Sequence, residues 1–301
     1  MQNFQMVDLT PPIAVVAHDA GAANLIKGWL EDFHNLDVRF CVDGPAKDIF
    51  RKAFPQFENL TMDGVLYDAS TLLSGTSGET DLEYLARKEA QKKGITSIGV
   101  VDHWVNYNKR FKRNGKIVLP NEIWVTDNYA LNMALQCFPS KIVKKMPNRY
   151  LQQVVESIYK KTDRSKKNQI IHVLYVLEPI HLDWNNSDIA GEYQALNYFI
   201  QHLDFIGDEN QIEIRLRAHP SEKDGKYNDW CKKNEHLNIV LDTENDLSDL
   251  IAWSDWVVGC ETFSMVIALH ANRKILSSLP PWAPLCKLPH EGIIQLRDLE
   301  K

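Results

Sequence analysis

Two segments in the second half of the sequence carry side chains that could bind a phosphate together. His219-Pro220 follows a strand-like run, and the proline prevents a helix from continuing back through the histidine. Glu261 and Thr262 begin a predicted helix that also contains Ser264, and the unpaired N–H groups at the start of a helix favour anions. We therefore predict that His219, Thr262 and Ser264 clamp a phosphate, with a purely structural histidine as the alternative.

Three acidic residues in the first half are candidates for a general base. Asp102 ends an apolar run and precedes aromatic residues, and burial can adjust the pKa of a carboxylate at such a strand end. Asp19 and Glu79 are the other candidates, although each lies near the start of a predicted helix, where it can serve as a cap. Asp102 is the predicted base, and its alternative role is to organise its own loop.

The first half also offers residues that could bind a sugar. The segment 75–78, Gly-Thr-Ser-Gly, could cradle an anion or a sugar hydroxyl, but an ordinary glycine turn with a hydroxyl cap explains it equally well. It lacks the lysine of a P-loop, which disfavours hydrolysis of nucleoside triphosphates. Two aromatic side chains after Asp102 could stack on a sugar. The predicted acceptor-binding residues are Gly75, Thr76, Ser77, Trp104 and Tyr107.

The elements that must position these residues alternate along the first half of the chain. Short apolar runs predict strands at 13–17, 38–42, 70–73, 95–101 and 122–126. Helical patterns predict helices at 20–33, about 45–53, 80–93 and 128–137. The segment 18–21, His-Asp-Ala-Gly, joins the first strand to the first helix and lacks the glycines of a dinucleotide-binding fingerprint.

The second half repeats this alternation. Strands are predicted at 169–177, 211–217, 238–241, 256–259 and 274–277, and helices at 190–203, 227–234, 247–253 and 263–271. Unbroken apolar strands that alternate with helices indicate parallel sheets covered on both faces. The sequence therefore predicts an α/β protein of two facing Rossmann-like doubly wound domains, with an interdomain cleft that binds ligands. The predicted domains are 1–158 and 169–301, and the polar, basic segment 159–168 is the predicted linker.

Composition and charge narrow the class of protein further. The 301 residues are 44% hydrophobic and 25% charged, which is ordinary for an enzyme of two domains. A net charge of −6 offers no basic surface, so nucleic acid is not an expected partner. Neither a signal peptide nor an apolar run of about 20 residues is present, and the 5 scattered cysteines fit a reducing compartment. We expect a cytoplasmic protein, which a peripheral position at the inner membrane face would also suit.

The order of motifs in the second half resembles the donor domain of GT-B glycosyltransferases. The resemblance is to bacterial sialyltransferases and related capsule or lipopolysaccharide transferases that use CMP-activated sugars. In those enzymes a His-Pro motif and a later Ser/Thr pair hold the donor phosphate, and an acidic residue between them holds the nucleoside. The resemblance implies that the donor is bound by His219, Pro220, Glu244, Asp246, Glu261, Thr262 and Ser264.

The same resemblance implies a reaction. A nonulosonic, sialic-type sugar would move from a CMP-activated donor to a hydroxyl of a glycan or lipid-linked saccharide. Asp102 in the acceptor-side domain would deprotonate that hydroxyl, while His219 and the two hydroxyl residues would stabilise the leaving phosphate. No metal and no cofactor is expected, because no DxD-type motif stands at a suitable loop. The oligomeric state stays open.

Two other kinds of function remain compatible with the sequence. One is a UDP-sugar 2-epimerase or a nucleotide-sugar hydrolase of the same architecture, which would need no acceptor. The other is a subunit that binds sugar nucleotides without turnover.

Overall fold

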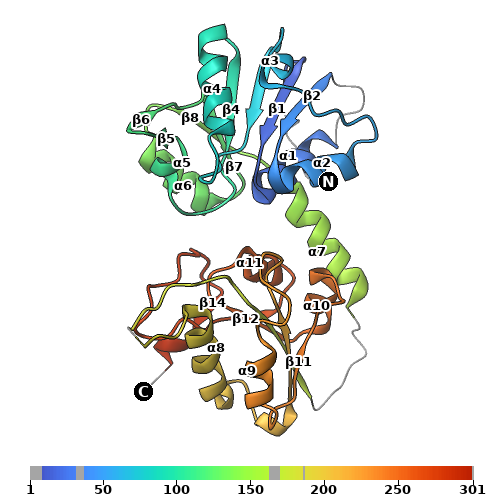
Figure 1. Cartoon of the computed structure of the whole chain (residues 1–301), viewed down its shortest axis with the longest axis vertical. Helices are drawn as coiled ribbons and strands as arrows, with labels where there is room; N and C mark the ends of the chain where they lie inside the picture. Colours follow the sequence, from blue (N-terminus) through green and yellow to red (C-terminus); the bar gives the residue numbers. More distant parts are fainter. Residues whose placement is uncertain (1–8, 32–36, 163–169, 186, 300–301) are drawn as a thin grey trace. The chain divides into compact units, whose positions relative to one another are not determined.

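The computed structural model describes residues 9–31, 37–162, 170–185 and 187–299. The chain divides into two compact units, unit 1 (Met1–Tyr150) and unit 2 (Leu151–Lys301) (Figure 1). This division falls inside α7 (Arg149–Lys161), whereas the sequence predicts a first domain that ends at residue 158. Residues 159–161 of the predicted linker are thus helical, and residues 163–168 lie outside the described part of the chain.

Helix α7 was not predicted, although its apolar residues have helical spacing. Leu151, Val154 and Ile158 lie three and four positions apart, and Ile158 is fully buried. The helix was missed because the residues that follow are polar and basic, which is typical of a linker. The end of the helix belongs to unit 2, because Lys161 forms an ion pair with Asp249 at 2.8 Å.

Unit 1 is built on a parallel sheet. Within the described residues its order is β2-β1-β3-β4-β7-β8, and every neighbouring pair is parallel. The strands are β1 (Ile13–Ala17), β2 (Val38–Val42), β3 (Thr71–Ser74), β4 (Thr96–Val100), β7 (Glu122–Val125) and β8 (Ile142–Lys145). Only β8 was not predicted from the sequence, because this edge strand is short and ends in two lysines.

Both faces of this sheet are covered. On β1, Val15 and its alternating neighbours pack with α1 and α2, while Ala14 and Val16 pack with α3 and α4. This two-sided burial explains why the strand is apolar at every position. The helices are α1 (Ala20–Leu30), α2 (Gly44–Ala53), α3 (Met62–Val65), α4 (Leu82–Lys93), α5 (Tyr107–Arg110) and α6 (Asn128–Cys137). A small antiparallel pair, β5 (Lys112–Arg113) and β6 (Lys116–Ile117), lies in the segment predicted as a polar loop.

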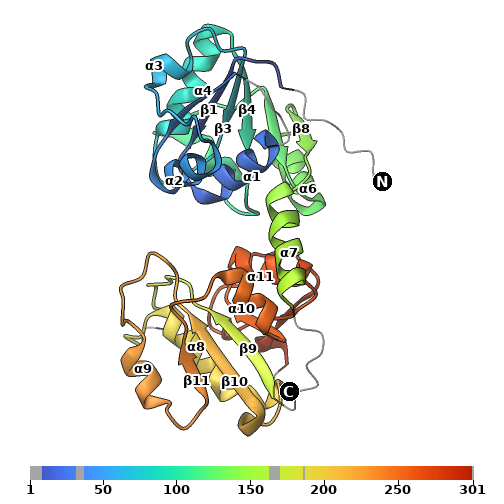
Figure 2. The ribbon, with the colours of Figure 1, turned by 90° about the vertical axis from the view of Figure 1, so that its right-hand side faces the viewer.

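Unit 2 repeats the architecture with a second parallel sheet. Its order in the described part of the chain is β11-β10-β9-β12-β13-β14. Figure 2 shows β9, β10 and β11 side by side. The strands are β9 (Ile171–Val176), β10 (Ile212–Arg217), β11 (Ile239–Leu241), β12 (Trp256–Gly259), β13 (Lys274–Ser277) and β14 (Ile293–Gln295). The helices are α8 (Gly191–Gln201), α9 (Asn228–Lys233), α10 (Leu247–Trp253) and α11 (Phe263–His270), with short 3₁₀ turns at Leu203–Phe205, Glu209–Gln211 and Leu296–Asp298.

Each sheet has a switch point, where successive strands begin to add on the other side of the first strand. In unit 1, β2 lies on one side of β1 and β3 on the other. In unit 2, β10 lies on one side of β9 and β12 on the other. Loops that leave the carboxyl ends of the strands diverge at such a point and form the usual ligand crevice of open α/β sheets.

Two further properties bear on the kind of protein. Among the helices of the described residues, none combines the length and the apolar character needed to cross a membrane. All five cysteines lie in the described part of the chain, and each is a free thiol.

Candidate active-site residues at the carboxyl ends of the strands

The loop after β1, at the switch point of unit 1, holds a histidine that is bonded to a carboxylate. Nδ1 of His18 lies 2.7 Å from Oδ1 of Asp19, and the backbone N–H of His18 donates to Oε1 of Glu83 at 3.0 Å. Burial opposes ionisation of the ring, but the hydrogen bond with Asp19 and the charges of Asp19, Glu83 and Glu79 raise the pKa of His18. A histidine oriented by a carboxylate is well suited to proton transfer.

Two of the predicted catalytic residues, Asp19 and Glu79, lie close to this histidine. Asp19 occupies the N-cap position of α1, yet its side chain makes no capping hydrogen bond and bonds to His18 instead. Glu79 is exposed, and it presents a side-chain oxygen within 4.8 Å of ligand atoms of His18 and Asp19. These three residues could hold a metal ion or exchange a proton. His18 itself was not among the residues predicted to be catalytic.

Asp102, the predicted base, lies after β4 and is held from two sides. Its Oδ1 accepts a hydrogen bond from Nη1 of Arg110 at 2.8 Å in a largely buried ion pair. Its Oδ2 lies against Gly21 at the start of α1, where a methyl group would overlap it. The sequence did not anticipate Arg110 as a partner. The catalytic role of Asp102 stays a prediction, and the geometry adds a structural role beside it.

A buried arginine supports the glycine turn after β3. Arg87 on α4 is fully buried and donates to the carbonyl oxygen of Gly75 at 2.8 Å and to Oγ of Ser74 at 3.2 Å. Burial lowers the pKa of Arg87 to about 10, although the charge of Glu83 opposes this shift. Burial likewise raises the pKa of Glu83. The turn is therefore fixed from inside the unit.

The hydroxyl groups of this turn are already engaged. Thr76 is buried, and its Oγ1 donates to the carbonyl oxygen of Val100 at 2.8 Å. Ser77 is buried as well, and its Oγ accepts the backbone N–H of Glu79 at 3.1 Å. Gly75 packs against Glu83, since a methyl group there would lie 2.7 Å from Oε1. These contacts favour the structural alternative over direct binding of an acceptor.

The two aromatic residues predicted to stack on a sugar are buried too. Nε1 of Trp104 donates to Oδ2 of Asp127 at 2.8 Å, and the hydroxyl of Tyr107 donates to the carbonyl oxygen of Ala130 at 3.3 Å. Both side chains pack inside unit 1 and offer no open face to a ligand. Their predicted role in acceptor binding is therefore not supported by this geometry.

At the switch point of unit 2, a carboxylate links the segments that follow two neighbouring strands. Glu178 follows β9, and its Oε1 accepts the backbone N–H groups of Cys260 and Glu261, after β12, at 2.8 and 2.9 Å. Burial raises the pKa of Glu178 to about 7, while those two hydrogen bonds act in the opposite direction. A carboxylate that titrates near neutrality at a switch point is a candidate for proton transfer. Glu178 was not among the site residues predicted from the sequence.

Some of the polar groups that were predicted to bind a phosphate at the start of α11 therefore already bond to other groups of unit 2. Oγ1 of Thr262 caps the helix by accepting the N–H of Ser264 at 3.3 Å. Glu261 forms an ion pair with Lys287 at 2.8 Å. Thr262 and Ser264 follow the backbone segment that bonds to Glu178, and they do not line the cavity that contains His219.

His219 lines a cavity beside the carboxyl end of β10. This cavity of about 650 Å³ is also lined by Arg217, Pro220, Asp242 and Thr243. The backbone N–H of Ser221 donates to Nδ1 of His219 at 3.2 Å, and Oγ of Ser221 lies 2.7 Å from the same nitrogen. The predicted nucleoside contacts Glu244 and Asp246 are exposed in the following loop and are not part of this lining.

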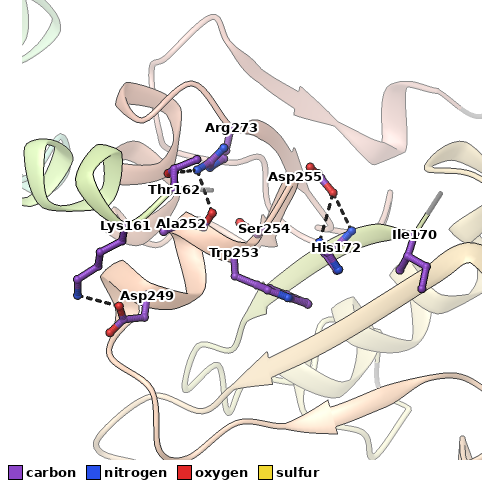
Figure 3. A pocket seen from close by; sticks show the side chains of 10 residues that line it. All are labelled: Lys161, Thr162, Ile170, His172, Asp249, Ala252, Trp253, Ser254, Asp255 and Arg273. Carbon is purple, nitrogen blue, oxygen red and sulfur yellow. Dashed lines mark hydrogen bonds and ion pairs between the residues drawn. The ribbon is translucent and has the colours of Figure 1, made fainter. Parts of the chain in front are cut away.

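A smaller cavity of about 240 Å³ lies at the opposite, amino end of the same sheet (Figure 3). The backbone N–H of His172 donates to Oδ2 of Asp255 at 2.9 Å. Arg273 donates to Oγ1 of Thr162 at 2.7 Å and to the carbonyl oxygen of Ala252 at 3.2 Å. The polar groups that line this cavity thus bond to one another. Ligands of open α/β sheets bind at the carboxyl ends of the strands, so this cavity at the amino end is not the candidate site.

Comparison with known proteins was made at the level of sequence and of structure. No family model matches the sequence, and neither does any curated protein. The chain is similar to the UDP-GlcNAc 2-epimerase of Neisseria meningitidis bound to UDP-GlcNAc, with a TM-score of 0.61 and 11% identity over 94% of this chain and 86% of that chain. It is also similar to the UDP-GlcNAc 2-epimerase of Methanocaldococcus jannaschii, with a TM-score of 0.56 and 12% identity over 88% of this chain and 83% of that chain.

A third solved structure, the UDP-N-acetylglucosamine 2-epimerase of Rickettsia bellii, gives a TM-score of 0.54 and 12% identity over 88% of this chain and 78% of that chain. At these identities the likeness establishes the fold. The prediction of two Rossmann-like doubly wound domains of GT-B type is confirmed. The narrower resemblance to CMP-dependent sialyltransferases finds no support among these structures.

Proposed function

We propose that this protein is an enzyme that acts on a nucleotide sugar, and that unit 2 binds the phosphate beside His219. The observation that carries the proposal is the hydrogen bonding of this histidine. Since the N–H of Ser221 donates to Nδ1, the neutral ring carries its proton on Nε2. The exposed ring can therefore donate a hydrogen bond to a phosphate oxygen.

The residues around His219 suit such a ligand. The cavity of about 650 Å³ falls in the size range typical of ligand sites. Arg217, Lys223 and Lys226 bring positive charge to its lining, and Thr243 adds a hydroxyl. The carboxylates of Glu222, Asp224 and Asp242 line the same cavity. The carboxylate of Asp242 is bound to Asn245, whose backbone N–H it accepts at 3.0 Å, so it fixes the loop beside the cavity. Phosphates would meet cations here, and polar groups could hold a nucleoside.

Two reactions on such a substrate remain in competition. The order of the motifs favours transfer of a sialic-type sugar from a CMP donor to a glycan hydroxyl, without a metal. The fold likeness to UDP-GlcNAc 2-epimerases favours epimerisation at C2 of a UDP-linked amino sugar. Epimerisation exchanges a proton at carbon, so it needs groups that accept and donate protons. His18 with Asp19, and Glu178, are the groups of this chain that we propose for that task.

A nucleotide panel tests the proposal at the level of binding. The melting temperature of the protein is measured with CMP, UDP, GDP and ADP, because a ligand that binds the native state raises it by mass action. We expect CMP or UDP to raise it, and His219→Ala to abolish the rise. His236→Ala, at an exposed histidine of the same unit, is the control. No stabilisation by any nucleotide would contradict the proposal.

Product analysis then separates the two reactions. With UDP-GlcNAc alone, an epimerase forms UDP-ManNAc, which chromatography resolves from its substrate. With a CMP-linked nonulosonic acid, a transferase releases CMP only when a glycan acceptor is present, and a hydrolase releases it without one. Binding of nucleotides without turnover of any donor would favour a non-catalytic binding subunit.

A further inference from the structure

Glu222, Lys226 and Tyr227 line the His219 cavity and also belong to a cluster of buried charges to which the proposed function gives no role. Glu192 in the first turn of α8 and Glu222 in the loop after β10 both bond to Nζ of Lys226, and the Glu222 contact is 2.6 Å long. Nδ1 of His181, in the loop after β9, lies 3.6 Å from Oε1 of Glu192. Three separate segments of unit 2 thus converge on one point.

The two carboxylates are deeply buried and incompletely bonded. The side chains of Glu192 and Glu222 are 2% and 5% exposed. Oε2 of Glu192 and Oε1 of Glu222 are both buried without a hydrogen-bond partner, and so is the hydroxyl oxygen of Tyr227. Tyr227 belongs to the same cluster, because its ring lies 5.3 Å from Nζ of Lys226. Buried polar atoms are nearly always paired, so the unpaired oxygens of two carboxylates that share one ammonium indicate a missing ligand.

The net charge of the cluster indicates whether that ligand is a cation or an anion. Two carboxylates and one ammonium leave a net negative charge in a buried setting, which is costly unless a further cation is bound. The other charged residues that line the adjoining cavity are Lys223 and Asp224, and their charges cancel. A cavity of about 650 Å³ opens onto the cluster, so an ion can reach it from solvent.

The donor set indicates the kind of cation. His181, Glu192 and Glu222 each present a ligand atom, and these atoms lie within 4.8 Å of one another. One imidazole nitrogen with carboxylate oxygens suits zinc or manganese, whereas magnesium and calcium prefer oxygen ligands alone. The imidazole of His181 is 71% exposed and can turn toward the carboxylates without disturbing the core.

We infer that His181, Glu192 and Glu222 form a binding site for a divalent transition metal, with zinc as the expected ion. Lys226 holds the two carboxylates together when the metal is absent, and its ammonium group swings toward solvent when the metal binds. Glu222 and Lys226 also line the His219 cavity, so this site adjoins the proposed phosphate site, but its test does not depend on enzymatic activity. It departs from the sequence-based expectation that the protein uses no metal.

Zinc titration of the full-length protein by calorimetry, after removal of bound metal with a chelator, tests the inference. We expect one zinc ion per chain, and we expect His181→Ala and Glu222→Gln each to weaken binding by about tenfold or more. Lys226→Met removes the competing ammonium and should tighten binding by about tenfold. The matched controls are His236→Ala and Asp224→Asn, which remove an exposed imidazole and an exposed carboxylate outside the three ligands.

Each outcome decides the question. Loss of zinc in the two ligand variants but not in the two controls supports the site. Equal affinity in all variants would mean that zinc binds elsewhere, for instance at cysteines, which every variant retains. Absence of binding would overturn the inference as well. If Lys226→Met or Glu222→Gln fails to fold, His181→Ala still decides, because this exposed side chain can be removed without loss of the fold.

Discussion

His219 is the residue on which the proposed function depends most directly. The hydrogen bond from the backbone of Ser221 fixes its tautomer, so the ring is prepared to donate from Nε2. We expect His219→Ala to lower turnover of the nucleotide sugar by about 10²-fold, as removal of a donor to the leaving phosphate would. Steady-state kinetics measure this loss, and a thermal melt controls for folding. Near-normal turnover in a folded variant would reduce His219 to a structural residue.

Asp102 has two roles that a single substitution can separate. Asp102→Asn removes one partner of a largely buried ion pair with Arg110, which should lower the free energy of unfolding by about 1–3 kcal/mol. If Asp102 is also the base, turnover is abolished while nucleotide affinity stays within about threefold. Denaturant unfolding and kinetics give the two readouts. Retained turnover, with a loss in Asp19→Asn, would move the proton transfer to the pair formed by His18 and Asp19.

Glu178 gives the stability of the protein a defined pH dependence. Its pKa is raised to about 7 in the folded state, mainly by burial, so the native protein binds a proton that the unfolded chain has already lost above about pH 4.5. The contribution of Glu178 to stability is therefore present at low pH and is lost as the pH rises through 7.

Glu178→Gln removes this titration but keeps an oxygen that accepts the N–H groups of Cys260 and Glu261. Between pH 5 and pH 8, the stability of the wild type relative to the variant should fall by about 1–3 kcal/mol. Urea unfolding at both pH values measures the difference. A constant difference between the two proteins would place the titration elsewhere.

At the scale of elements, the start of α1 illustrates how closely the loops of unit 1 are packed. A methyl group at Gly21 would overlap Oδ2 of Asp102, so glycine is required for this approach. We expect Gly21→Ala to lower the free energy of unfolding by about 1–3 kcal/mol. At Gly78 nothing lies within 4 Å of an added methyl group, so Gly78→Ala should change stability by less than about 0.5 kcal/mol. Equal effects of the two substitutions would show that the Gly21 contact carries no energy.

The long elements could be predicted from the sequence, because their side chains repeat with a clear period. The helices 128–137 and 247–253 were predicted with the bounds that the structure has. Short elements such as α3 and β14 contain four and three residues, too few for a period to be recognised. The apolar residues of α7 have helical spacing, but the basic residues at its end led to the prediction of a linker.

Contacts within the candidate site were harder to predict than the elements, because they join segments far apart in sequence. Nothing near residue 178 indicates that its carboxylate will bond to N–H groups of residues 260 and 261. The sequence likewise did not indicate that Arg110 is the partner of Asp102, although the two residues are only eight positions apart. Thr76 and Trp104 were predicted to bind a ligand on the basis of their residue types alone. In the structure, the packing of unit 1 buries both side chains.

At the scale of the whole molecule, two units of the same architecture raise the question of which one binds the nucleotide. The loops at the switch point of unit 1 carry the acidic side chains of Asp19 and Glu79, and the buried Arg87 of α4 is committed to the glycine turn. Unit 2 presents the exposed His219 at an open cavity, where Arg217, Lys223 and Lys226 balance three carboxylates. A nucleoside phosphate should therefore bind to unit 2 and leave the loops of unit 1 unchanged.

Hydrogen exchange of the full-length protein tests this assignment. With CMP or UDP at saturation, we expect slower exchange at the backbone amides of 218–227 and 242–245, and unchanged exchange at 18–21 and 75–78. His219→Ala should remove the protection at both segments of unit 2, while His236→Ala should keep it. CMP and UDP lack the sugar that is linked to the phosphate in the substrate, so protection confined to unit 1 would mean that the nucleotide itself binds there. That result would reverse the assignment of the two units while leaving the GT-B fold unaffected.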